Sequence, residues 1–323
     1  MTVKIPLIKD NVMKKSDLRG SLLLLITAVI WGLAFVVQDS VGGRVGEYTL
    51  NASRFIVAAV FLIPCIILFD LKTDRRLFDF KNRRIDITKK EWLGGALCGI
   101  ALAVASVLQQ IGISRGAGAG VAGFLTSLYV VIVPIFGIAL GRKTSAKNWI
   151  CTLVAIFGVF LISYSGGGFS LADIFVLICA VAFAVHITVI DVVSPGCDGV
   201  RLSLVQFITG AAVTLPFAIF IEHPSASAIG SCLFPIIYLG VMSSGIAYTL
   251  QIIGQKKTSP AVASIIMSLE SVFAAIGGVL IAGEDFGWRK FFGCLTVFIS
   301  VIITQIDLAA IFGKFRLKKQ KSE

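Results

Sequence analysis

The sequence predicts an all-α integral membrane protein of ten transmembrane helices, arranged as two five-helix repeats of inverted topology. Three observations predict it: an apolar composition, ten apolar windows of helix length, and an internal repeat. Of the 323 residues, 57% are hydrophobic and 15% charged, and the mean hydropathy is +0.93. Soluble domains carry about a quarter charged residues, so we expect no sizeable soluble domain here.

Ten windows are apolar enough for a helix that crosses the hydrocarbon core, which takes about 20 residues. Their approximate bounds are 20–38, 52–69, 92–112, 119–140, 148–164, 172–190, 202–221, 234–253, 261–282 and 290–312. We expect a cytoplasmic N-terminal segment at 1–19, repeats at 20–164 and 172–308, and a basic cytoplasmic tail at 313–323. An even number of spans places both termini on the same side of the membrane.

The loops between the windows, taken in order, decide which side that is. The terminal segments and the loops at 70–91, 141–148, 191–201 and 254–260 hold 24 of the 29 Lys and Arg residues. Basic residues accumulate on the cytoplasmic side, so we predict a multi-pass protein of the plasma or inner membrane with cytoplasmic termini. This placement explains the net charge of +11 without a nucleic-acid partner.

The two halves of the chain resemble one another. At an offset of 152 residues Asp39 falls on Asp191 and Pro64 on Pro216, and at an offset of 142 the two LQxIG segments coincide. Each half holds five windows, an odd number, so the halves must enter the membrane in opposite orientations. Inverted repeats are typical of secondary transporters, whose substrate sites lie near the bilayer midplane between the repeats.

The ninth window, Ala261–Gly283, holds a single acid, Glu270, near its centre. A carboxylate at that depth costs about 2.5–3.5 kcal/mol on insertion scales, and such residues usually face a cavity or a partner. A branched apolar stripe is predicted to face lipid: Val262, Ile265, Leu269, Val272, Ile276 and Val279. Glu270 lies off that stripe. It either lines a substrate cavity and carries or senses a proton, or is a protonated structural residue hydrogen-bonded between helices.

Six further residues inside the windows are candidates for the cavity wall: Trp31, Arg54, Gln109, Tyr129, His186 and Tyr248. The aromatic rings have polar tips that suit a cavity, although packing is the alternative. Gln109 could contact substrate or join two helices by a hydrogen bond. His186 could relay protons near neutral pH or bind a backbone carbonyl.

Arg54 lies about one turn into the second window, and two interpretations are open. It could extend its charge to the lipid headgroups or pair with Glu47. Alternatively it faces the cavity, where it holds an anionic or carboxylate group of the substrate or pairs transiently with Glu270. Its repeat mate is Gln206, so this charge occurs in one half only.

Several segments resemble the drug/metabolite transporter superfamily, EamA type. They are WGLAF at Trp31–Phe35, ASRF at Ala52–Phe55, the two LQxIG segments, and LESVFAAIGGVLIAGE at Leu269–Glu284. The resemblance covers about residues 20–306 and implies a metabolite transporter, often an exporter of amino acids or related small molecules. Members typically have Glu-Pro where this chain has Glu270-Ser271, so the ninth helix is expected to be straighter than the family pattern.

These observations predict a secondary-active or facilitative exporter of small metabolites, with alternating access around a midplane cavity. Protons are a candidate coupling ion, with Glu270 as their carrier. The seven cysteines, an odd number without a CxxC spacing, give no reason to expect a disulfide framework, a metal site or a cofactor. Two alternatives are an integral-membrane enzyme acting on lipid and a regulatory subunit without solute flux. The substrate and the oligomeric state stay open.

Overall fold

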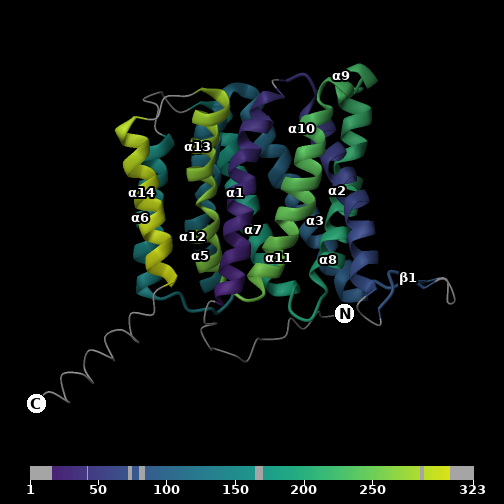
Figure 1. Cartoon of the computed structure of the whole chain (residues 1–323), viewed down its shortest axis with the longest axis horizontal. Helices are drawn as coiled ribbons and strands as arrows, with labels where there is room; N and C mark the ends of the chain where they lie inside the picture. Colours follow the sequence, from purple (N-terminus) through teal and green to yellow (C-terminus); the bar gives the residue numbers. More distant parts are fainter. Residues whose placement is uncertain are drawn as a thin grey trace, which may run out of the picture.

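A bundle of long helices makes up almost all of the described chain (Figure 1). The computed structural model describes residues 17–41, 43–71, 75–79, 84–163, 170–283 and 287–305, without the side chains of 118–120, 163 and 282. The predicted tail 313–323 and most of the predicted segment 1–19 lie outside these residues. The start of α1 and the end of α14 lie toward the same end of the bundle, which we call the basal end (Figure 1).

In chain order the elements are α1 (Leu18–Ser40), α2 (Glu47–Asp70), β1 (Phe78–Asp79), β2 (Arg84–Ile85), α3 (Lys89–Gly112), η1 (Ile113–Ala117), α4 (Gly118–Ser127), α5 (Tyr129–Ala139), α6 (Ala146–Ser163), α7 (Leu171–Val193), α8 (Gly199–Phe217), η2 (Ala218–Glu222), α9 (Ala226–Ser231), α10 (Leu233–Tyr238), η3 (Leu239–Tyr248), α11 (Thr249–Gln255), α12 (Pro260–Met267), α13 (Glu270–Ala282) and α14 (Trp288–Gln305). The elements named η are π-helical. The two short strands pair antiparallel, with Phe78 opposite Ile85.

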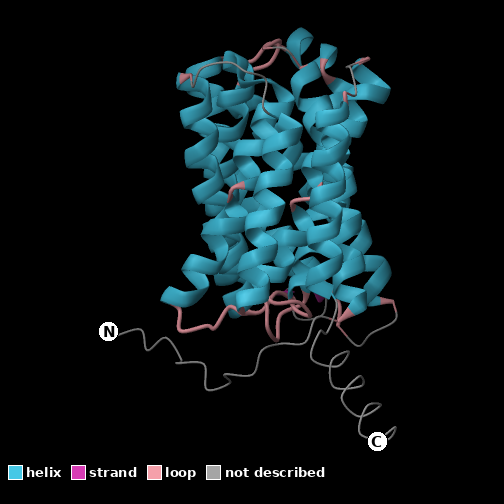
Figure 2. Cartoon of the chain, turned by 90° about the vertical axis from the view of Figure 1, so that its left-hand side faces the viewer, coloured by secondary structure: helices cyan, strands magenta, loops and turns pink. Residues whose placement is uncertain are grey.

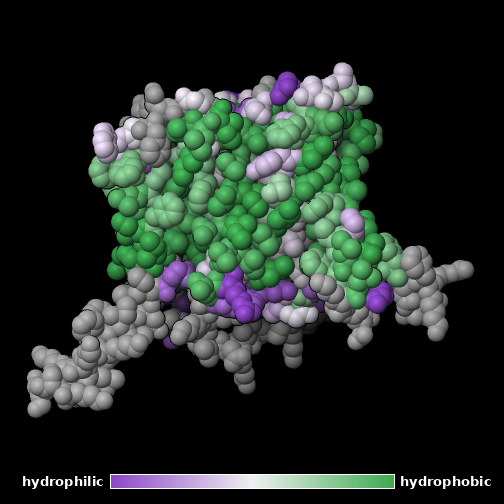
Figure 3. Space-filling view, in the orientation of Figure 1, coloured by the Kyte–Doolittle hydropathy of each residue, from purple (hydrophilic) through white to green (hydrophobic). Residues whose placement is uncertain are grey.

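Within the described residues, eight helical segments are long and apolar enough to cross a membrane. They are α1, α2, α3 with η1, α4 with α5, α7, α8 with η2, α10 with η3 and α11, and α12 with α13. The remaining two long helices, α6 and α14, coincide with the fifth and tenth apolar windows but are shorter or less apolar. On the face that Figure 3 shows, apolar side chains form a broad band across the middle of the bundle, and polar residues gather toward its ends. The chain is therefore a multi-pass membrane protein.

Local sequence explains where several helices begin. Thr88 and Ser170 each form a capping box with the acid three residues later, at the starts of α3 and α7. Ser259 caps α12, and Pro260 follows at the first helical position, where its missing N–H has no partner to lose. Polar residues between the windows thus end one helix and start the next.

Two of the crossing segments are broken near their middle, visible as short loop segments inside the bundle (Figure 2). Leu128 separates α4 from α5, and Ser268 with Leu269 separates α12 from α13. The backbone N–H groups of Leu128 and Leu269 donate to residues three positions earlier, Leu125 and Ile266, as in a 3₁₀ turn. The ninth helix, expected to be straighter than the family pattern, is thus interrupted by a tight turn that contains no proline.

Four of the six residues predicted to face lipid are instead buried, and the other two, Ile276 and Val279, are partly buried. Ile265, Leu269 and Val272 are at most 1% exposed, and the last two pack against Val159 and Val297. Those partners belong to α6 and α14, which lie side by side and cover this side of α13 (Figure 1). An apolar stripe fits a neighbouring apolar helix as well as it fits lipid, so the pattern alone could not separate the two.

Helix α2 pairs with α8, and each end of this pair is fastened by an acid. At one end the carboxylate of Glu222 accepts hydrogen bonds from the backbone N–H groups of Tyr48 and Thr49, at 2.9 and 2.7 Å. At the basal end Asp70 forms an ion pair with Arg201, with 2.7 Å between Oδ1 and Nη2. The two arrangements join the C-terminal end of one helix to the first turn of the other.

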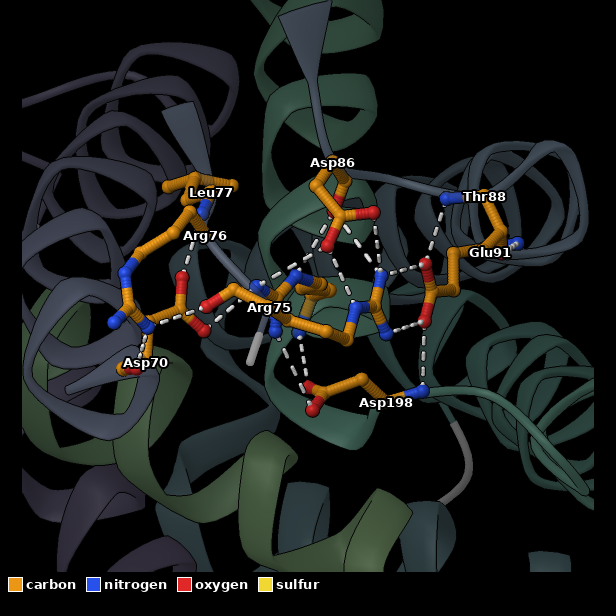
Figure 4. Close-up of polar contacts among 9 residues, drawn as sticks. Asp70, Arg75, Arg76, Leu77, Asp86, Thr88, Glu91 and Asp198 are labelled. Atoms are coloured by element: carbon orange, nitrogen blue, oxygen red, sulfur yellow. Dashed lines mark hydrogen bonds and ion pairs between the residues drawn. The ribbon is translucent and has the colours of Figure 1, made fainter. Parts of the chain in front are cut away.

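The ion pair at Asp70 belongs to a larger basal network, which consists of Asp70, Arg75, Asp86, Glu91, Asp198 and Arg201 (Figure 4). The guanidinium of Arg75 lies between the carboxylates of Asp86 and Glu91. Hydrogen bonding to Asp86, with a further contribution from Glu91, raises the pKa of Arg75 above its usual range. Glu91 also accepts a hydrogen bond from the backbone N–H of Asp198, which ties α3 to the α7–α8 connection.

Candidate functional site

A cavity lies inside the bundle, lined by residues of the two broken segments and of α1, α2, α3, α7, η3 and α11. It encloses about 420 Å³ of space not filled by atoms, solvent at its opening included. Its lining residues are Trp31, Ala34, Phe35, Gln38, Arg54, Gln109, Thr126, Tyr129, Phe183, Ile187, Ser243, Tyr248, Gln251 and Glu270. The wall combines aromatic rings with a few polar groups, which is the usual composition of a small-molecule site.

Glu270 lies at the first position of α13, immediately after the break, and is 3% exposed. Its Oε1 accepts a hydrogen bond from the Tyr129 hydroxyl at 3.1 Å and a longer one from the Ser127 hydroxyl at 3.4 Å. Both donors flank Leu128, so the acid at one break is held by hydroxyls from the other. The N-terminal end of α13 also favours a negative charge at this position.

Arg54 is equally buried, at 3% exposed, and lies on the same cavity wall. Its Nη1 is 3.4 Å from the side-chain oxygen of Gln38, and its Nε has no hydrogen-bond partner. Among the ion pairs of the described residues none includes Arg54, so neither Glu47 nor Glu270 is its partner in this conformation. No acid of the described residues therefore forms an ion pair with this guanidinium.

The aromatic candidates Trp31, Tyr129 and Tyr248 line the same cavity as these two charged groups. Trp31 and Tyr248 are in ring contact, with centroids 4.6 Å apart, and the indole N–H of Trp31 donates to the carbonyl of Ser243 at 3.1 Å. Tyr129 reaches Glu270, as described above. These contacts leave ring faces and edges on the cavity wall, which can hold the apolar part of a solute.

His186 lies behind the cavity rather than on its wall. Its Nε2 is 2.9 Å from the side-chain oxygen of Gln206, and its ring meets Tyr248 edge to face. The repeat mates Gln109 and Gln251 both line the cavity. Gln109 donates to the Thr126 hydroxyl at 3.1 Å, whereas the side-chain oxygen of Gln251 has no hydrogen-bond partner.

Gln38 is the polar lining residue of α1 that the sequence reasoning missed. A signal for it was present, because Trp31, Ala34, Phe35 and Gln38 follow the 3/4 spacing of one helix face, and all four line the cavity. In the described part of the chain no group of three or more His, Cys, Asp or Glu side chains could hold a metal ion.

Comparisons with known proteins agree with this architecture. The model of the EamA-like transporter family matches the chain twice, at residues 18–164 and 170–306. An uncharacterized transporter of Archaeoglobus fulgidus is 27% identical over 287 residues, which is 88% of this chain and 84% of that protein. The uncharacterized inner membrane transporter YicL of Salmonella typhimurium is 25% identical over 302 residues, 90% of this chain and 97% of that protein.

A solved crystal structure shares the fold, with a TM-score of 0.70 and 17% sequence identity. The alignment covers 88% of this chain and 96% of that one. The two family matches together span nearly all of the described residues. The chain belongs to the EamA-like transporter family.

Proposed function

We propose that this protein is a secondary-active or facilitative transporter that exports small metabolites, such as amino acids or related compounds. Ten helices, α6 and α14 included, cross the membrane as two inverted five-helix repeats, with both termini in the cytoplasm. Substrate binds in the cavity between the repeats, which opens alternately to either side. The observation that supports this most is that two broken helices, one from each half, meet at a buried polar cavity.

Contacts between the halves support the inverted repeat. Thr49 contacts Glu222, and their repeat mates, 152 residues away, are Arg201 and Asp70, which also contact one another. A Cβ on Gly158 would lie 2.8 Å from the carbonyl oxygen of Gly293. Their mates at an offset of 142 are Ser300 and Cys151, and the Ser300 hydroxyl donates to the Cys151 carbonyl at 2.7 Å.

Each contact thus has a partner contact in which the two repeats have exchanged roles. This reciprocity is what a two-fold axis between the repeats produces, since residue i meets j and the mate of i meets the mate of j. With five helices in each repeat, that axis lies in the membrane plane, as in other secondary transporters. Rocking of the repeats about it would expose the cavity to each side in turn.

Glu270 is the proposed site of proton coupling. It is the acid on the cavity wall, and its hydrogen bonds to Ser127 and Tyr129 join the broken helix of one repeat to that of the other. Protonation would remove the charge that these hydroxyls and the α13 N-terminus stabilise, and so would change how firmly the two breaks are held together.

The test uses the full chain in liposomes. A panel of metabolites is first screened by uptake and efflux in cells that lack or overproduce the protein, and the transported compound is then followed in liposomes across a range of pH. We expect Glu270→Gln to abolish the pH dependence, whereas Glu47→Gln, an acid substitution outside the cavity, should keep it. Absence of flux for every compound would reject the transporter; a full pH response in Glu270→Gln would reject only the coupling role.

A further inference from the structure

Of the two arginines that are buried among the described residues, Arg201 has acidic partners and Arg54 has none within that part of the chain. The two side chains are equally buried, yet Arg201 has Asp70 at 2.7 Å and two more carboxylates within 4 Å. Around Arg54 the described neighbours are neutral: Gln38 and the phenol of Tyr248. A buried charge without a counter-charge is strongly destabilising, so an anion that reaches this point gains the interaction that the fold leaves unmade.

The donors of Arg54 suit a carboxylate in particular. A guanidinium presents its N–H groups in a planar fork that matches the two oxygens of a carboxylate, and here the Nε of that fork has no partner. Arg54 lies on the cavity wall together with Gln38, whose side chain is also buried. An entering carboxylate can thus be bound without breaking an existing ion pair.

The repeat supplies this charge only once. The mates of Arg54 and Gln38, at an offset of 152, are Gln206 and Ile190, and neither lines the cavity. Gln206 instead bonds to His186. The buried cation on the cavity wall therefore comes from the first half of the chain, and the corresponding position of the second half is a neutral contact between Gln206 and His186.

We propose that Arg54, with Gln38 beside it, binds the single carboxylate of the transported solute. This inference rests on the proposed function and adds the substrate class: compounds with one carboxylate and an apolar or cationic body. Trp31 and Tyr248 take the body, and Glu270 on the same wall disfavours a second anionic group and accepts a cationic one. Dicarboxylates and cations that lack a carboxylate are excluded.

Acetate is the smallest probe of this position, and acetamide is its neutral match. Thermal unfolding of the purified full chain in lipid nanodiscs is followed with each probe for the wild type, Arg54→Gln and Glu47→Gln. We expect acetate to raise the Tm of the wild type and of Glu47→Gln, with an affinity about 10- to 100-fold above that of acetamide. Arg54→Gln carries the residue of the repeat mate and should bind the two probes alike.

An equal response of the wild type to acetate and acetamide, or an acetate response that survives in Arg54→Gln, would overturn the proposal. Should Arg54→Gln not fold, the wild type still decides it through the acetate-to-acetamide ratio and through the absence of a response to malonate, the matching dicarboxylate. The outcome is separable from that of the proposed function. Acetate binding without flux rejects transport alone, and flux of a metabolite without any acetate response rejects this position alone.

Discussion

The Asp70–Arg201 ion pair offers a quantitative test of how the two halves are joined. Both side chains are 4% exposed, and Asp70 also accepts a hydrogen bond from the backbone N–H of Leu77 at 2.6 Å. In Asp70→Asn the shape stays and the charge is lost, which leaves Arg201 with Asp198 at 3.6 Å and Asp86 at 3.8 Å. Breaking a buried pair costs about 3–5 kcal/mol. Because the two remaining acids compensate in part, we expect about 3 kcal/mol.

The assay is reversible unfolding in mixed detergent micelles, followed by the loss of helix signal. Lys257→Gln is the matched control, because Lys257 and Asp17 form a pair at the same end of the bundle with side chains 43% and 44% exposed. That substitution should cost less than about 1 kcal/mol. Arg201→Met should resemble Asp70→Asn, and the double variant should lose less than the sum of the two. Equal costs for Asp70→Asn and Lys257→Gln would refute the reasoning.

Three further expectations concern packing and hydrogen bonds. Gly158→Ala would bring a methyl group within 2.8–2.9 Å of Gly293 and Val297, so it should lower the free energy of unfolding by about 1–3 kcal/mol. The control is Gly230→Ala, whose added methyl group would have no atom within 4 Å and should change the free energy of unfolding little. A similar cost for both variants would contradict the close approach of α6 and α14. Thr49→Val removes the hydroxyl bond to Glu222 but keeps the backbone bond, and should cost about 0.5–1.5 kcal/mol in the same unfolding assay. No loss would show that the hydroxyl bond adds nothing to the stability. Trp31→Phe loses the indole bond to the Ser243 carbonyl, so we expect a loss of about 1 kcal/mol, and no loss would show that the carbonyl finds another donor.

The positions of the helices could be predicted because long apolar windows and the internal repeat can both be read directly from the sequence. Nine windows and the described part of the tenth coincide with helices, and eight segments of the described chain satisfy the length and hydropathy of a membrane span. The buried acid could be singled out for the same reason, since a carboxylate in a long apolar window is rare. It lies on the cavity wall, and its role in transport stays a prediction.

The breaks and the covered stripe could not be predicted, for two physical reasons. At Ser268 and Leu269 the helix is interrupted because the Leu269 N–H donates to the carbonyl three residues earlier instead of four. Neither residue is a glycine or a proline, which are the residues that would indicate a break in the sequence. The stripe of Ile265, Leu269 and Val272 is apolar whether it meets lipid or α14. Which of the two it meets depends on how α6 and α14 fold back, and that is a property of the whole chain.

The absence of proline from the two breaks has a consequence for movement. A proline kink is permanent, because the ring has no amide proton to give back to the helix. Here the amides of Leu269, Ser271 and Val272 keep their protons and donate to residues three positions earlier; a continuous α-helix would need each of them to move to the carbonyl one residue further back. To straighten or bend at this break, backbone N–H groups would only exchange one carbonyl acceptor for its neighbour. Such an exchange of hydrogen bonds can be repeated without any change of covalent geometry.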